Sequence, residues 1–173
     1  MSSGADEPET RRRDLRLADL AALAAASEAA GQPAAVFDAV EALSAATIGH
    51  RLFTIMRFDA ARAEVERVHT SLQSAYPVGG RKQKPESAWS NQLLRDRKVF
   101  RATGPDDIRA AFDDHATILG LGLGSILNVP VAFDGRCIGT MNLCHRAGWY
   151  TADDEETGRV LAAFLVPALL RKG

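Results

Sequence analysis

The chain is 173 residues long, and its 46% hydrophobic and 25% charged residues are typical of a single globular domain rather than a disordered or fibrous protein. Its 21 basic and 22 acidic side chains leave a formal charge of −1, which excludes a chain-wide electrostatic attraction to nucleic acid or anionic lipid. No apolar run approaches the roughly 20 residues of a membrane span and no signal peptide is recognisable, so we expect a cytoplasmic protein without nucleic-acid or membrane partners.

The N-terminal part of the chain divides into a tail and a helix. Residues 1–13 are mostly polar or charged and have little to bury, so we expect a disordered tail. Residues 14–31 are rich in alanine and contain spaced leucines, with Asp14 as a candidate cap and Gly31 as a stop. We interpret this segment as an N-terminal helix and a candidate dimerisation element that precedes the main domain, residues 32–173.

The main domain begins with a helix and a hairpin. A helix is predicted from Pro33 to Thr47, because apolar side chains recur there every three or four residues. Residues 51–58 and 64–73 favour strands, and the short segment between them suits a hairpin turn.

The middle of the chain is less regular. Residues 74–86 contain two prolines and a glycine pair, which is typical of a binding loop, a lid or a disordered loop. A short helix ending at Arg95, a brief strand near Phe100 and a helix opened by Pro105 are predicted to follow.

The clearest strands come late in the chain. Ser125–Phe133 and Cys137–His145 flank Asp134-Gly135, a dipeptide that favours a two-residue hairpin turn. Such a turn predicts the register, in which the opposed pairs are Phe133 with Arg136, Val129 with Thr140, Leu127 with Asn142, and Ser125 with Cys144. One predicted face therefore carries Ser125, Leu127, Val129, Thr140, Asn142 and Cys144. The other carries Ile126, Asn128, Pro130, Cys137, Gly139, Met141 and Leu143. Both faces are mainly apolar, so we expect both to be covered.

The C-terminal segment predicts an acidic-capped helix. Thr151 is the candidate cap, and residues 153–156 place four carboxylates in the first turn, where they meet the positive end of the helix dipole. Pro167 predicts a kink or an early end.

These features together resemble the GAF domain family. The resemblance is carried by the order of elements and by the segment LNVPVAFDGRCIGTMNLCH with the acidic helix start that follows it, and it covers roughly residues 33–170. It implies an α+β fold, with a central antiparallel β-sheet, N- and C-terminal helices on one face, and a loop-covered pocket on the other. It also implies a small-molecule ligand and a homodimer through the terminal helices. The Asn-Lys-Phe run of many cyclic-nucleotide GAF domains is absent, and no cysteine stands beside His115 to tether a bilin.

The candidate ligand-binding residues fall on the late hairpin and in the irregular middle. Ser125, Asn128, Thr140 and Asn142 place polar groups on apolar strands, where they are either pocket walls or satisfied structural residues. The remaining candidates from the middle of the chain are Tyr76, Arg81, Lys82, Trp89 and His115.

Arg81, Lys82 and Lys84 place three cations beside a glycine pair, which suits an anionic ligand; the alternative is a solvated loop. Trp89 is either a core anchor or a stacking surface. His115 is either a ligand contact or an exposed residue at a short helix.

Cysteine and metal chemistry have little support in the sequence. Cys137 and Cys144 are seven residues apart on one predicted strand, so we expect them on opposite faces and unable to form a disulfide. No metal-binding motif and no catalytic motif are present, and no cofactor is indicated.

We therefore expect a noncatalytic, ligand-binding sensory or signalling module. The alternatives are an enzyme on the same fold, either a thiol-dependent reductase or a small-molecule hydrolase, and a ligand-free dimerisation scaffold with a filled core.

Overall fold

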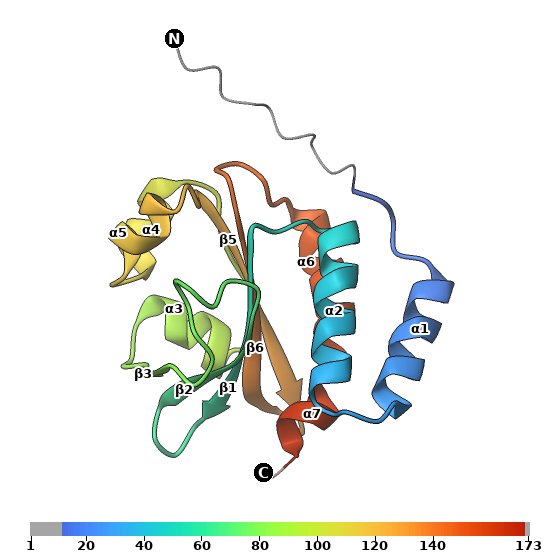
Figure 1. Cartoon of the computed structure of the whole chain (residues 1–173). Coiled ribbons are helices and arrows are strands. Elements are labelled where there is room, and N and C mark those ends of the chain that lie inside the picture. The colour runs from blue at the N-terminus through green and yellow to red at the C-terminus, as the bar shows by residue number, and fades with distance from the viewer. Residues whose placement is uncertain (1–11, 172–173) are drawn as a thin grey trace.

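The structure, a computed structural model, describes residues 12–171 and is built around one six-stranded antiparallel sheet (Figure 1). The strand order is β3-β2-β1-β6-β5-β4. The strands are β1 (Leu52–Asp59), β2 (Glu64–Thr70), β3 (Arg81–Gln83), β4 (Phe100–Ala102), β5 (Ser125–Phe133) and β6 (Arg136–His145). The predicted α+β fold with a central antiparallel sheet is confirmed.

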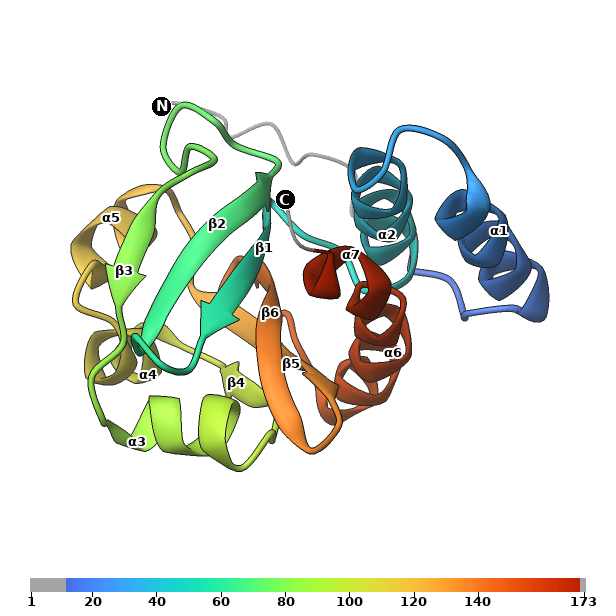
Figure 2. The ribbon, with the colours of Figure 1, turned by 90° about the horizontal axis from the view of Figure 1, so that it is seen from below.

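Helices cover both faces of the sheet (Figures 1 and 2). One face carries the terminal helices α1 (Leu17–Glu28), α2 (Ala34–Thr47), α6 (Ala152–Ala163) and α7 (Val166–Leu170), with α1 outermost against α2. The other face carries the short helices α3 (Ala88–Ser90), η1 (Asn91–Arg95, a π-helical turn), α4 (Pro105–Ala111) and α5 (His115–Gly120). The main hydrophobic core lies under the terminal helices.

The local signals in the sequence produce the expected elements at both ends of the domain. In α6, Thr151 and Asp154 form the reciprocal hydrogen bonds of a capping box, which satisfies backbone N–H groups at the helix start. Pro167 follows the end of α6 and stands in the first turn of α7, because proline cannot continue the hydrogen-bond ladder of the preceding helix. The loop over residues 74–86 holds one strand that was not predicted, the charged edge strand β3.

The late hairpin forms as predicted at its turn and departs from the predicted register two residues later. Asp134 and Gly135 have φ angles of 49° and 69°, the conformation of the expected two-residue turn. The register then shifts between Val131 and Ala132: Ala132 pairs with Cys137, but Val131 pairs with Gly139. Ile138 is therefore an extra residue on β6, and the hairpin contains a β-bulge.

Because of the bulge, three of the predicted pairs and both predicted faces are wrong. The observed pairs are Val129 with Met141, Leu127 with Leu143, and Ser125 with His145. Leu127, Val129, Met141 and Leu143 accordingly share one face and belong to the core beneath the terminal helices. Asn128, Thr140 and Asn142 turn to the opposite face. A one-residue slip exchanges the faces of a strand, so a single bulge accounts for the whole difference.

Residues 1–11 of the predicted N-terminal tail lie outside the described residues, but the last two residues of that tail are placed. Arg12 donates to the carboxylate of Asp154 at 2.9 Å, and the backbone N–H of Arg13 donates to the carbonyl of Ala46 at 3.2 Å. These contacts attach the start of the described chain to α2 and α6. No helix within residues 12–171 is both long and apolar enough to cross a membrane.

Candidate functional site

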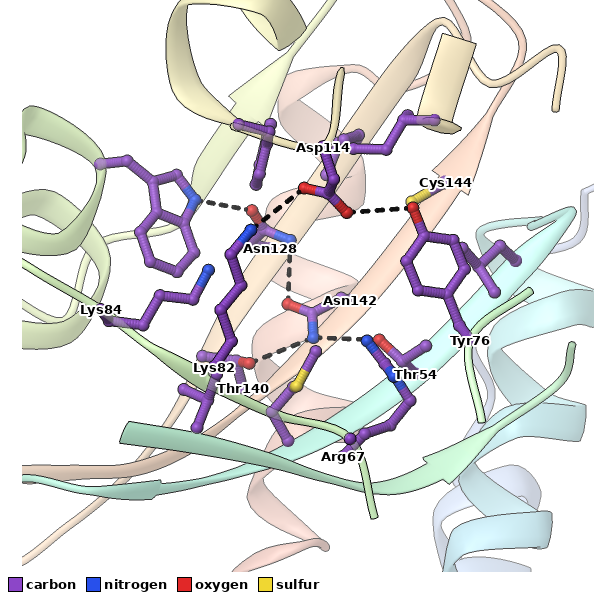
Figure 3. A pocket seen from close by; sticks show the side chains of 18 of the residues that line it. Thr54, Arg67, Tyr76, Lys82, Lys84, Asp114, Asn128, Thr140, Asn142 and Cys144 are labelled. Carbon is purple, nitrogen blue, oxygen red and sulfur yellow. Dashed lines mark hydrogen bonds and ion pairs between the residues drawn. The ribbon is translucent and has the colours of Figure 1, made fainter. Parts of the chain in front are cut away.

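A cavity of about 230 Å³ lies on the sheet face opposite the terminal helices (Figure 3). The sheet supplies its floor, the segment from Tyr76 to Lys84 and α3 supply one side, and the α4–α5 segment supplies the other. The polar and charged residues that line it are Thr54, Arg67, Tyr76, Arg81, Lys82, Lys84, Trp89, Asp114, Asn128, Thr140 and Asn142. This is the loop-covered pocket that the resemblance implied.

A chain of hydrogen bonds organises the polar floor of the cavity. The indole Nε1 of Trp89 donates to Asn128 Oδ1 at 2.9 Å, and Asn128 Nδ2 donates to Asn142 Oδ1 at 2.9 Å. Asn142 Nδ2 in turn donates to the hydroxyls of Thr54 at 3.2 Å and Thr140 at 3.1 Å. Because each amide is held at both ends, the floor presents a fixed pattern of polar groups from β1, β5, β6 and α3.

Arg67 brings a guanidinium group from β2 to the wall of the cavity. Its carbon Cζ lies 5.0 Å from the ring centroid of Tyr76, and its Nη1 donates to the carbonyl of Pro77 at 3.0 Å. Its Nε is buried and has no hydrogen-bond partner among the described residues. A Cβ on Gly80 would lie 2.8 Å from Arg67 Nη1, so a larger residue there would displace the end of the Arg67 side chain. Burial lowers the pKa of Arg67, although the group stays charged at neutral pH.

Asp114 is the carboxylate that faces these cations. Its Oδ1 lies 3.3 Å from Lys82 Nζ, and its Oδ2 accepts a hydrogen bond from the hydroxyl of Tyr76 at 3.1 Å. Burial by itself raises the pKa of Asp114, but the charge of Lys82 and the hydrogen bonds outweigh it, so the pKa lies below its ordinary value. The pKa of Tyr76 is raised, by burial first and then by Asp114. Asp114 therefore links the β2–β3 segment to the α4–α5 segment across the mouth of the cavity.

Lys84 differs from Lys82 because no carboxylate pairs with it among the described residues. Its Nζ lies 4.4 Å from the ring centroid of Trp89, and its backbone N–H donates to the carbonyl of Ala63 at 2.7 Å. Burial, and secondarily the charge of Lys82, lowers the pKa of Lys84 to about 8. The cavity thus holds one paired lysine and one half-buried lysine without an acidic partner.

The structure brings together all but two of the residues predicted to bind a ligand. Tyr76, Arg81, Lys82, Trp89, Asn128, Thr140 and Asn142 line the cavity. Arg81 is partly neutralised there by Glu64 at 3.1 Å and Glu66 at 3.2 Å.

The other two predicted residues lie elsewhere. Ser125 is fully buried outside the cavity and donates to the carbonyl of Arg146 at 2.7 Å. His115 begins α5 and does not line the cavity.

Three residues of the site were not predicted from the sequence. Thr54 and Arg67 lie on the first two strands, and only their position beside β6 and the loop brings them to the cavity. Asp114 precedes α5, where it makes no side-chain cap hydrogen bond, and it points into the site instead. The strand that carries Arg67 also contains Glu64, Glu66 and His69, so nothing in the sequence singled Arg67 out.

The cysteines are placed differently from the prediction but remain unsuited to thiol chemistry. Cys137 packs with Trp89 and Leu93, and Cys144 lines the cavity, so the bulge places both on the same side of the sheet. They are roughly 20 Å apart along β6, and both are free and buried. Burial raises the pKa of both thiols, that of Cys144 to about 12. Within residues 12–171 no group of three or more His, Cys, Asp or Glu side chains is arranged to hold a metal ion.

Comparison with known families and structures gives a consistent assignment. The profile of the GAF domain family matches residues 15–169. The GAF domain of a phosphoenolpyruvate-protein phosphotransferase from Coxiella burnetii is similar, with a TM-score of 0.70 and 14% identity over 88% of this chain and 91% of that chain.

Two further solved structures have the same fold. The GAF domain of a two-component sensor histidine kinase from Bacillus halodurans has a TM-score of 0.66 and 15% identity, covering 80% of this chain and 93% of that chain. The chromophore-binding domain of a bacteriophytochrome from R. palustris has a TM-score of 0.63 and 14% identity, covering 89% of this chain and 61% of that chain. No curated protein sequence matches the chain significantly. At these identities the structural likeness establishes the fold alone.

Proposed function

Since the chain belongs to the GAF domain family, a family of sensory and signalling domains, we propose that it is a noncatalytic sensor that binds a small anionic molecule in the cavity. The observation that carries this proposal is the guanidinium of Arg67, which lines the cavity and forms no ion pair with a carboxylate of the described residues. A guanidinium group binds carboxylate and phosphate oxygens through charge-assisted hydrogen bonds, and an anion in the cavity would supply the counter-charge that Arg67 lacks. The proposed ligand therefore carries a carboxylate or a phosphate.

The charge balance of the cavity supports an anion over a neutral or cationic ligand. Arg67, Lys82 and Lys84 contribute three positive groups besides the neutralised Arg81, and Asp114 contributes one negative group. Guanidinium and ammonium groups in a partly desolvated site bind carboxylate and phosphate oxygens through short, charge-assisted hydrogen bonds. The hydrogen-bonded floor would recognise a second, uncharged polar end of the same molecule.

The size of the cavity supports a small metabolite. Its volume of about 230 Å³ lies below the roughly 300 to 1,000 Å³ of sites that enclose drug-sized ligands. The presence of a cavity between the sheet and its covering segments also argues against the ligand-free scaffold, for which a filled core was expected. Buried thiols with raised pKa values offer no support for a thiol-dependent reductase.

Binding would act on the segments that close the cavity, and a dimer would transmit the change. A ligand anion would compete with Asp114 for Lys82 and would loosen the link between the β2–β3 and α4–α5 segments. We assign dimer formation to the terminal helices, with residues 14–31 as the added element. This assignment is supported by α1, where Leu17 is 81% exposed and Leu23 is the one fully buried residue of the helix.

The binding proposal is tested by calorimetry and thermal shift with acetate, lactate, succinate, inorganic phosphate and ethyl phosphate. We expect at least one anion to raise Tm and the Arg67→Met variant to bind it 10- to 100-fold more weakly, as the loss of a charged hydrogen bond predicts. Lys98→Met is the matched control, because it removes a positive charge from an exposed position outside the cavity. The proposal fails if no anion binds, or if both variants bind as the wild type does.

A further inference from the structure

Lys84 lines the cavity without an ion-pair partner among the described residues. The backbone hydrogen bond to Ala63 holds it beside the hairpin of β1 and β2, and Figure 3 shows its side chain reaching toward the cavity. Its Nζ lies over the Trp89 ring at 4.4 Å, and no carboxylate of the described residues lies within ion-pair distance of it. Burial removes hydration that favours the protonated form of the Lys84 amine, and this effect outweighs the opposing charges of Asp114 and Asp113.

The neighbouring lysine provides the contrast. Lys82 is two residues away on the same segment and lines the same cavity, but it is paired with Asp114 at 3.3 Å and approaches Asp113 at 4.0 Å. The positive charge of Lys82 also disfavours a second positive charge on Lys84. A lysine that is partly desolvated and stands beside another cation is the arrangement by which proteins activate an amine.

From this placement we propose that Lys84 is a reactive amine that forms a reversible imine with a small carbonyl compound whose carboxylate or phosphate is held by Arg67 and Lys82. The proposal rests on the anion-binding function proposed above, and it narrows the ligand to aldehydes and ketones that carry an anionic group. Burial and Lys82 lower the pKa of Lys84 to about 8. At pH 8 about half of the amine is then neutral, against roughly one part in 300 at the ordinary lysine pKa of 10.5.

The chemical step requires no oxidant, reductant or further reactant. The lone pair of neutral Nζ forms a bond to the carbonyl carbon, and the π pair of the C=O bond moves to oxygen. The two amine protons finish on that oxygen, which leaves as water when the C=N bond forms. Hydrolysis reverses the same steps, so the imine reports the ligand concentration without consuming the ligand.

The direct test is reductive trapping of the full chain. The chain contains only four lysines, Lys82, Lys84, Lys98 and Lys172, so fragment-ion mapping of the adduct distinguishes every site and separates them from the N-terminal amine. The protein is incubated at pH 8 with pyruvate, glyoxylate or glycolaldehyde phosphate and with sodium cyanoborohydride. We expect at least one of them to give one principal adduct, on Lys84, formed at least tenfold faster than any adduct on Lys98.

Variants test whether the adduct forms on Lys84 and whether its formation depends on Arg67. Lys84→Arg keeps the positive charge and is expected to abolish the principal adduct. Lys98→Arg, at an exposed position outside the cavity, is the matched control and is expected to retain it. Arg67→Met is expected to slow trapping at least tenfold at subsaturating probe, since the anionic end loses its partner. Equal labelling of Lys82, Lys84 and Lys98, or no adduct on Lys84 with any of the three probes, would overturn the proposal.

Carbonyl-free counterparts of the probes separate this inference from the binding function. Lactate, glycolate and ethyl phosphate carry the anionic group but form no imine, and their binding is measured by calorimetry. Binding of a counterpart without trapping on Lys84 would refute imine formation but would still support the proposed binding of an anion. Trapping on Lys84 that Arg67→Met leaves unchanged, with no counterpart bound, would refute the anion sensor and with it the anionic ligand class inferred here.

Discussion

Replacing Gly139 by alanine tests the close packing of β6 against β1 and α7 beside the β-bulge. Gly139 pairs with Arg57 of β1, and a Cβ there would collide with the carbonyl oxygen of Met56 and lie 2.6 Å from Leu169 Cδ1. Leucine Cδ1 can rotate away, but the Met56 carbonyl belongs to the backbone of β1 and moves only with that strand. Overpacking of a tight site costs typically 1 to 3 kcal/mol, and the fixed backbone places this variant at the upper end, at about 3 kcal/mol.

The assay is urea unfolding followed by circular dichroism, with thermal unfolding as a second measurement. A loss of 3 kcal/mol corresponds to a fall in Tm of roughly 6 to 12 °C for a domain of this size. Gly120→Ala is the matched control: nothing lies within 4 Å of its added Cβ and its φ is not in the left-handed region, so we expect a change within about 0.5 kcal/mol. A Gly139→Ala variant as stable as this control would refute the close approach of β6 to β1 and the register built on it.

Three further predictions concern the cavity and the terminal helices. Asp114→Asn should raise the affinity for the bound anion about two- to fivefold in calorimetry, because it removes the competing carboxylate, whereas Asp113→Asn, 94% exposed, should leave the affinity unchanged. The folded-state pKa of Lys84 is about 8 and its ordinary value is 10.5, so between these pH values the unfolded chain binds more protons and stability rises with pH. Chemical unfolding of the wild type and Lys84→Met should therefore show the wild type gaining stability relative to the variant from pH 8 to 10.5, and parallel curves would contradict the lowered pKa. Leu17→Asp should convert a dimer to a monomer in light scattering, whereas Val78→Asp, at a 49% exposed loop position, should not; a dimer that survives Leu17→Asp is not formed through α1.

The sequence predicted the order of elements well because that order depends on local signals. Proline at the start of a helix, Thr151 with its acidic turn, and Asp134-Gly135 between two apolar runs each act over a few residues. The charged edge strand β3 was missed because three polar residues, Arg81 to Gln83, carry no apolar alternation, and only pairing with β2 makes them a strand.

The site was predictable only in part because its residues meet through the tertiary fold. The basic loop with Lys82 and the polar strand residues Asn128 and Asn142 could be recognised from composition alone. Arg67 and Thr54 could not, since nothing local distinguishes a strand residue that faces a cavity from one that faces solvent or core. Asp114 reaches the site only because the segment between α4 and α5 folds back over the sheet toward Tyr76.

The bulge at Ile138 explains both why the predicted register was wrong and how the polar floor of the cavity forms. Without it, Leu127 and Val129 would share a face with Asn142, and no continuous polar floor could form beside a continuous apolar core. With it, Asn128 and Asn142 become directly opposed neighbours, and their amides close the hydrogen-bond chain that begins at Trp89. A glycine inside a predicted strand is a recognised sign of a bulge or a close backbone approach; Gly139 lies next to the bulged Ile138 and closely approaches the backbone of Met56. The predicted register treated Ile138 as an ordinary strand position. As the extra residue of the bulge, Ile138 instead shifts β6 so that its polar residues face the cavity and its apolar residues face the core.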